Sequence, residues 1–255
     1  MAFEQGKAPV EYKYYTGLCN FTPVLVNPSK EDLSKYGVNL KEDPSYTDDS
    51  AEGNKRVRVD IWGYLEISKE ERPFNKVTFF IEDRERESVA TPGNFQFINE
   101  FGDATWGASA EELKGKYDWF GGNSIRKAKS GEPDLINFIK KLLNIGKNQV
   151  AKLDNISALI GGNVKEVAEA ISKAGDKRIQ VLATIREYDG SFYQSIYNQY
   201  FGTAGSKFFK GWQKHLENQI KSPNYQNSLA LKEFDPVAIS SPSSTESSSD
   251  SNPWA

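Results

Sequence analysis

Residues 56–67 alternate between apolar and polar side chains, and this alternation constrains the fold more than any other feature of the sequence. Successive side chains of a β-strand point to opposite faces, so the pattern is typical of a strand with one buried face. The face predicted to point inward carries Val57, Val59, Ile61, Leu65 and Ile67. The face predicted to point outward carries Arg56, Arg58, Trp62 and Tyr64. The chain therefore needs a sheet around this strand and a core on one side of it.

Further strands are predicted before and after this run. An apolar, β-prone segment begins at Tyr14 and ends at a turn signal at 27–29, and residues 76–82 alternate again. Near the end of the chain, 178–187 and 192–201 flank an Asp-Gly pair, which is a strong hairpin signal.

Helices are predicted between these groups of strands and after them. Residues 132–144 have a broad apolar face and Pro133 in the first turn, and 164–175 and 206–221 show helical spacing. A short helix is expected at 30–36, and 102–131 is expected to be irregular.

Three strands, a helix and two strands form the order of an OB-fold, a five-stranded Greek-key barrel. The sequence thus predicts a mainly β, OB-fold-like barrel with added helices, in which the apolar piece at 94–101 is an extra strand or an insertion. A mixed α+β sheet and two small subdomains are the alternative architectures. We expect a flexible leader at 1–13, one domain at 14–238 and a disordered tail at 239–255.

The predicted tail is rich in Ser and contains no Lys or Arg. Such a segment buries too little apolar surface to offset the entropy of ordering it. Its acids, Glu246 and Asp250, precede Pro253 and Trp254 near the end. Charge followed by an aromatic residue is typical of a docking peptide for a partner protein, and a frayed terminus is the alternative.

Composition limits the classes of function. The formal net charge of the 255-residue chain is −3, so any nucleic-acid site must be a local patch. One Cys and one His leave little material for a disulfide framework or a zinc site, and we predict no metal and no cofactor. Reducing cytosol is the expected compartment, and the sequence shows neither an apolar span nor a signal peptide.

Aromatic and cationic side chains are interleaved on the outward face of the predicted sheet. Lys76, Phe80, Tyr193 and Tyr197 of neighbouring strands extend the set that begins on residues 56–67. Single-stranded nucleic acid stacks its bases on aromatic rings and places its phosphates against cations. The alternative is that these rings pack against the helices.

A second basic group, formed by Arg126, Lys127 and Lys129, leads into the helix at 132–144. Helix N-termini and nearby cations hold phosphate well, although a solvated loop has the same composition. An acid-rich run at 82–87 suggests a metal-dependent nuclease, but alternation with Arg favours a solvated loop. His215 has no nucleophile motif nearby, so we predict a protein that is not an enzyme.

Residues 119–145 resemble the single-stranded DNA-binding proteins of large tailed bacteriophages. The similarity rests on Arg126-Lys127-Ala128, Gly131-Glu132 and Leu142-Leu143-Asn144, with 117–120 and 193–201 also similar. The resemblance implies an OB-fold that coats replicating DNA in the cytoplasm of the infected bacterial host. It also implies a tail that recruits replication proteins such as a polymerase, helicase or primase, and it allows self-association. The chain departs from the family in lacking a Cys/His zinc cluster and a densely acidic tail.

The sequence therefore predicts sequence-independent binding of single-stranded DNA in replication, recombination or repair. Trp62, Tyr64, Tyr193 and Tyr197 are the expected stacking residues. Arg56, Arg58, Lys76, Arg126, Lys127 and Lys129 are the expected phosphate-binding residues. In the free protein the acidic tail is expected to occupy the basic groove. The alternative is a non-enzymatic structural or assembly protein of a phage.

Overall fold

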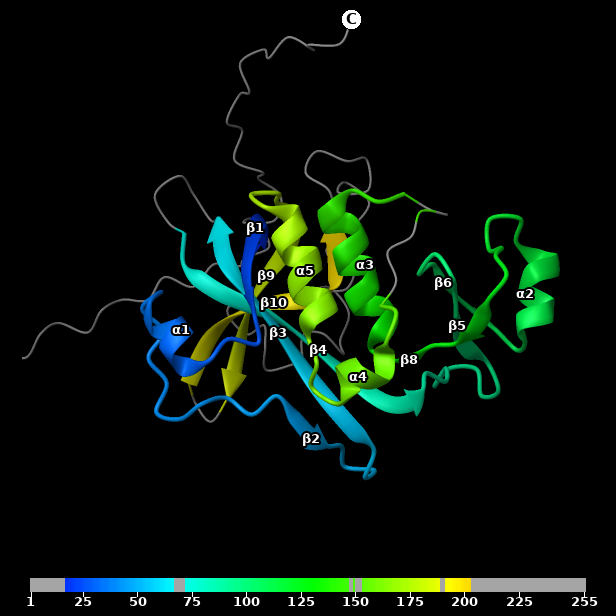
Figure 1. Cartoon of the computed structure of the whole chain (residues 1–255), viewed down its shortest axis with the longest axis horizontal. Helices are drawn as coiled ribbons and strands as arrows, with labels where there is room; N and C mark the ends of the chain where they lie inside the picture. The colour runs from blue at the N-terminus through cyan, green and yellow to red at the C-terminus, as the bar shows by residue number, and fades with distance from the viewer. Residues whose placement is uncertain (1–16, 67–71, 147–148, 150–152, 189–190, 203–255) are drawn as a thin grey trace, which may run out of the picture.

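A curled antiparallel sheet forms the centre of the computed structural model of this protein (Figure 1). The structure describes residues 17–66, 72–146, 149, 153–188 and 191–202. The predicted leader at 1–13, the predicted helix at 206–221 and the predicted tail at 239–255 lie outside these residues. The predicted mainly β class with added helices is confirmed.

The main sheet has the strand order β10-β9-β1-β3-β4-β8, and β2 also pairs with β3. Its strands are β1 (Gly17–Val26), β2 (Thr47–Asp49), β3 (Lys55–Glu66), β4 (Phe74–Glu85), β8 (Lys129–Ser130), β9 (Ile179–Tyr188) and β10 (Ser191–Gly202). The sheet curls until β10 returns to β4, where Asn75 Nδ2 donates a hydrogen bond to the carbonyl oxygen of Gln194 at 3.2 Å. The result is a half-barrel.

The inward face of β3 forms the core, as its alternation predicts. Val57, Val59, Ile61 and Leu65 are fully buried. Gly63 completes this face where β1 crosses closely, since a Cβ atom there would lie 2.1 Å from the carbonyl oxygen of Thr22. A larger residue at 63 would push the two strands apart.

Three helices between β4 and β9 pack against the sheet: α3 (Glu132–Leu143), α4 (Ile156–Ile160) and α5 (Lys165–Ala174). Figure 1 shows α3 and α5 side by side in front of the strands, and the two predicted helices at 132–144 and 164–175 are confirmed. Phe138 of α3 meets Phe79 of β4 and Phe201 of β10, with ring centroids 5.6 and 5.0 Å away. This aromatic cluster ties α3 to β4 and to β10, where the curled sheet returns on itself.

The apolar piece predicted at 94–101 belongs to an insertion with its own sheet. The order β6-β5-β7 joins β5 (Phe95–Asn99), β6 (Ala104–Gly107) and β7 (Ile125–Lys127), and α2 (Ala110–Lys116) follows β6. Phe97, Leu113 and Phe120 form a small separate core. In Figure 1 the insertion stands to one side of the half-barrel. The prediction that 102–131 is irregular is wrong, since β6, α2, β7 and the short strand β8 lie there. The sequence did not indicate them because each element is too short to show a period.

The connection from β1 to β3 contains α1 (Lys30–Ser34), where a short helix is predicted. Ser29 begins it, and its hydroxyl accepts a hydrogen bond from the backbone of Asp32 at 3.1 Å. The connection returns to the sheet as β2. It therefore lies beside β3, along the edge of the face that points away from the core.

Candidate functional site

Pairing of β3 with β4 brings the predicted site residues of both strands onto one face. Trp62 lies opposite Lys76, and Arg58 lies opposite Phe80. We call this surface the outer face. It comprises Arg56, Arg58, Asp60, Trp62 and Tyr64 of β3 together with Phe74, Lys76, Thr78, Phe80 and Glu82 of β4.

Aromatic rings on the outer face form a stack rather than separate platforms. Phe74 lies between Tyr36, 4.3 Å away with an interplanar angle of 10°, and Trp62, 5.8 Å away at 18°. Tyr64 meets Phe74 edge-on at 5.2 Å. Tyr36 and Phe74 are not among the residues predicted from the sequence, because only the return of the long connection and the strand register bring them to this face.

Cations cover several of these rings. Lys76 Nζ lies 5.2 Å from the ring centre of Trp62, and the guanidinium of Arg56 lies 5.0 Å from that of Phe80. Covered by Phe74 and Lys76, Trp62 is only 9% exposed, so it supports the stack and does not offer an open ring face. Phe80, in contrast, is 45% exposed. The ring that a planar ligand reaches first is therefore Phe80.

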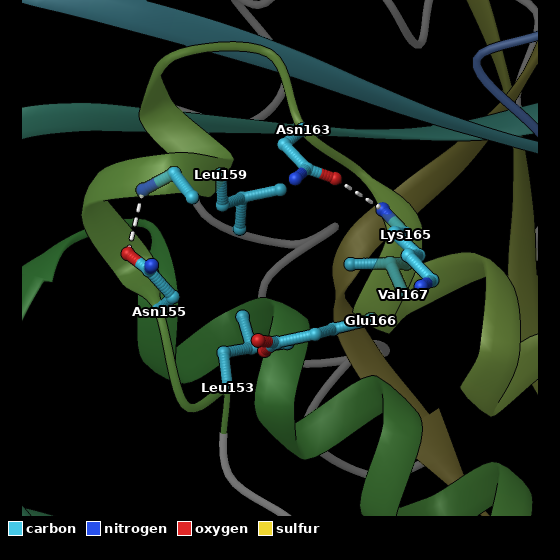
Figure 2. A pocket seen from close by; sticks show the side chains of 8 residues that line it. Leu153, Asn155, Leu159, Asn163, Lys165, Glu166 and Val167 are labelled. Carbon is cyan, nitrogen blue, oxygen red and sulfur yellow. Dashed lines mark hydrogen bonds between the residues drawn. The ribbon is translucent and has the colours of Figure 1, made fainter.

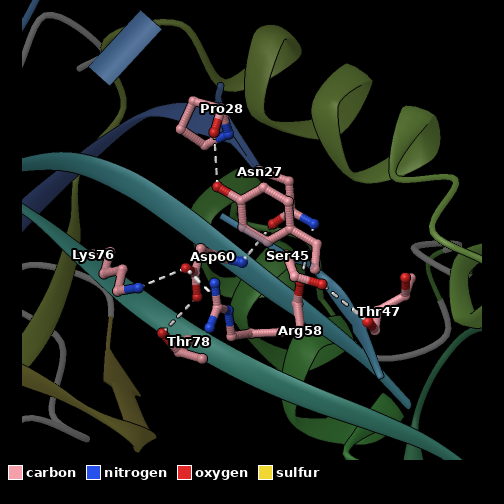
Figure 3. Close-up of polar contacts among 9 residues, drawn as sticks. Asn27, Pro28, Ser45, Thr47, Arg58, Asp60, Lys76 and Thr78 are labelled. Carbon is pink, nitrogen blue, oxygen red and sulfur yellow. Dashed lines mark hydrogen bonds and ion pairs between the residues drawn. The ribbon is translucent and has the colours of Figure 1, made fainter. Parts of the chain in front are cut away.

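Asp60 lies beneath these groups and is only 1% exposed (Figure 3). Its carboxylate lies 2.6 Å from Lys76 Nζ and 3.4 Å from Arg58 Nε, and it accepts a hydrogen bond from the hydroxyl of Thr78 at 2.8 Å. Asp60 is not among the site residues predicted from the sequence. Its signal is an acid at the centre of a strand face that otherwise carries Arg and aromatic residues.

The connection from β1 to β3 is fastened to the same network. Asn27 Nδ2 donates to the carbonyl oxygen of Arg58 at 2.9 Å, and the hydroxyl of Tyr46 donates to that of Pro28 at 2.8 Å. The guanidinium of Arg58 lies 5.3 Å from the ring centre of Tyr46. Burial raises the pKa of Tyr46, and the charge of Asp60 adds to this effect. Tyr46 therefore remains a neutral hydrogen-bond donor at neutral pH.

The second predicted basic group has a different environment. We call 126–129 the basic segment. Arg126 forms an ion pair with the buried carboxylate of Glu132. Hydrogen bonding to this carboxylate raises the pKa of the Arg126 guanidinium. The same carboxylate accepts a hydrogen bond from the backbone N–H of Lys129 at 2.9 Å. The start of α3 thus already holds a carboxylate of the protein. The predicted phosphate site would therefore have to share Arg126 and the N–H of Lys129 with Glu132.

The two lysines of the basic segment are also paired. Lys127 Nζ lies 2.7 Å from a carboxylate oxygen of Glu85, and Lys129 Nζ lies 2.8 Å from one of Asp83. Hydrogen bonding to Lys129 lowers the pKa of Asp83. Both acids lie in β4 and are exposed, so this run is solvated as predicted, but residues 82–85 form the end of a strand and not a loop. The acid-rich run is a strand end whose carboxylates complement the basic segment.

The basic segment lies beyond the Phe80 end of the outer face, because Ser130, next to Lys129, pairs with Glu82, two positions along β4 from Phe80. Lys129 lies opposite Glu85, nine positions along β4 from Lys76, which corresponds to about 30 Å of strand. Tyr197 is partly buried in β10, whose middle lies beside the start of β4. The side chain of Tyr193 lies outside the described structure, as do Glu246, Asp250, Pro253 and Trp254 of the predicted tail.

Figure 2 shows a pocket of about 120 Å³ between α4 and α5. Its polar groups are used by the backbone: Asn155 accepts from the N–H of Ala158 at 2.9 Å, and Asn163 accepts from that of Lys165 at 3.1 Å. The pocket therefore reflects the capping of two helices and offers no set of free polar groups.

Reactive side chains are few in the part of the chain that the structure describes. Within it, no group of three or more His, Cys, Asp or Glu side chains is placed to hold a metal ion. Cys19 is buried, which raises the pKa of its thiol. Among the same residues, no helix combines the length and apolar composition that a membrane span requires.

No protein-family model matches the chain, and neither a curated protein nor a solved structure is significantly similar to it.

Proposed function

We propose that this chain is an OB-fold protein that binds single-stranded DNA without sequence preference. The strand order supports the fold: β1, β3, β4, β9 and β10 follow the order of the five barrel strands, with helices between the third and the fourth. OB-folds bind oligonucleotides on the face of their second and third strands and on the adjoining loops. In this chain those strands are β3 and β4.

The observation that carries the proposal is the composition of the outer face. Phe80, although Arg56 lies over its ring, is exposed enough to offer ring surface to a base. Tyr64 and Tyr36 extend the aromatic surface along the same face. Three cations lie over aromatic rings, and these contacts fix their positions at the surface where phosphates would bind: Arg56, Arg58 and Lys76. Each stacked base contributes roughly 1–3 kcal/mol, which suits a protein whose net charge is negative.

The wider role follows from the resemblance to phage proteins. In this proposal the chain is not an enzyme; it protects single strands in phage replication, recombination or repair in the host cytoplasm. The segment 239–255, with Glu246, Asp250, Pro253 and Trp254, recruits a polymerase, helicase or primase. A non-enzymatic structural or assembly protein is the alternative.

The test is fluorescence anisotropy of a labelled oligo-dT strand, titrated with the full chain at low and moderate salt with duplex DNA as competitor. We expect the chain to prefer the single strand and to bind more weakly as salt rises. Phe80→Ala should lower the affinity about tenfold, since one stacking ring is lost.

Trp106→Ala provides the matched control, because Trp106 is an aromatic residue of similar exposure, 40%, on the insertion. This variant should bind within about twofold of the original chain. Absence of binding at low salt would reject the proposal and favour the structural alternative. Equal losses for both variants would show that DNA does not follow the outer face.

A further inference from the structure

On the outer face a single buried carboxylate serves two cations. Asp60 is almost completely buried, whereas Arg58 and Lys76 remain partly exposed, so solvent reaches the cations but not their partner. A hydrogen bond from the hydroxyl of Thr78 and one from its own backbone N–H to Asn27 hold Asp60 in place. The group of three charges therefore keeps one net positive charge at the surface.

We propose that Asp60 is an internal counterion that limits how strongly the outer face attracts phosphate while it holds Arg58 and Lys76 over their rings. This inference rests on the proposed binding of single-stranded DNA. A phosphate that approaches from solvent contacts the open sides of the two cations and shares them with Asp60. The carboxylate is too deeply buried to leave.

The position of Asp60 distinguishes it from Asp48, another acid near this face. Asp48 also pairs with a cation of the outer face, Arg56, at 2.6 Å, but more than half of its side chain is exposed. Solvent and salt screen an exposed carboxylate, and the ion pair gives way easily to a competing phosphate. A buried carboxylate keeps its effect on the neighbouring cations in the presence of salt.

The inference has a measurable consequence in the salt dependence. Each phosphate that a protein neutralises on a single strand adds about −0.7 to the slope of log affinity against log salt concentration. With Asp60 present, Arg58 and Lys76 together count as about one charge. Without it they count as two, so the slope should become steeper by about 0.7.

The experiment compares the full chain with Asp60→Asn by oligo-dT anisotropy between about 50 and 300 mM salt. The amide retains the shape of the side chain and still accepts a hydrogen bond from Thr78. We expect the affinity to rise about fivefold at the lowest salt, with an excess that shrinks as salt rises. Asp60→Ser makes the same charge change with a smaller side chain and serves if the amide variant does not fold.

Glu111→Gln is the control for a general change in net charge, since Glu111 is an exposed residue at the start of α2. Thr78→Val removes a hydrogen bond to Asp60 but no charge, and it should leave the slope unchanged. If the original chain does not bind oligo-dT, the proposed function fails. If the chain binds but neutral replacement of Asp60 leaves the affinity equal or lower, Asp60 is only structural and the inference is overturned.

Discussion

The outer face and the basic segment are both clusters of cations in the sequence, but in the structure their cations are paired with carboxylates in different ways. On the outer face Arg58 and Lys76 share one carboxylate and lie over aromatic rings. In the basic segment each cation has a carboxylate of its own. The number of Lys and Arg side chains in a segment therefore does not determine the net charge of the surface that the segment forms. The carboxylates that the fold brings to them do.

The two regions also differ in what the ion pairs accomplish. Pairs of the basic segment join β7 and β8 to β4 and to the first turn of α3, so they connect the insertion, the sheet and the helix. The ion pairs of Asp60 join side chains of one sheet face and leave the two cations partly open to solvent. The basic segment therefore serves architecture, and the outer face is the better candidate for a ligand.

The largest effect is expected for Glu132→Ala. This change leaves Arg126 without its partner and removes the acceptor for the backbone of Lys129, so the free energy of unfolding should fall by about 2–3 kcal/mol. Denaturant unfolding measures it. Glu85→Ala, which breaks the exposed pair with Lys127, is the control and should change stability by less than about 0.5 kcal/mol. Equal losses would contradict the architectural role of the buried pair.

An effect of intermediate size is expected on DNA affinity, and it distinguishes the outer face from the basic segment. Lys76→Ala should weaken oligo-dT binding about fivefold at low salt and make the salt slope shallower, because one cation of the outer face is lost. Lys127→Ala removes the same charge from the basic segment and should leave the affinity within about twofold. Anisotropy titrations give both values. If Lys127→Ala lowers the affinity more than Lys76→Ala does, DNA binds at the basic segment and not at the outer face.

The smallest effect concerns the titration of Asp83. Hydrogen bonding to Lys129 lowers the pKa of this carboxyl group in the folded protein. Its contribution to stability is therefore present above the pKa of the unfolded chain and is lost as pH falls through the lower, folded value. Carboxyl chemical shifts followed by NMR should show the pKa of Asp83 rise toward its ordinary value in Lys129→Ala. No change in that variant would mean that the pair does not persist in solution.

Much of the main sheet could be predicted because its signals are local. Alternation in β3 and β4 and helical spacing in α3 and α5 depend on neighbours a few positions apart. The insertion could not be predicted in the same way. Its strands are three to five residues long, and its core forms only when Phe97, Leu113 and Phe120 meet.

The site shows the same division. Alternation in β3 alone predicts that Arg58, Trp62 and Tyr64 share the side away from the core, because that geometry belongs to any extended strand. Which rings are open and which cations are neutralised depends on contacts between distant residues. Lys127 meets Glu85 from 42 positions away. Tyr36 stacks on Phe74 only because the long connection returns to the sheet.

The sequence by itself thus determined the long strands of the main sheet, the faces of β3 and β4 and the helices α3 and α5, since these follow from the period of side chains along the backbone. The tertiary structure decided that Trp62 is covered, that Phe80 is open and that Asp60 lies between two cations. Burial and charge at a point depend on everything the fold places there, whereas periodicity depends only on the chain next to it.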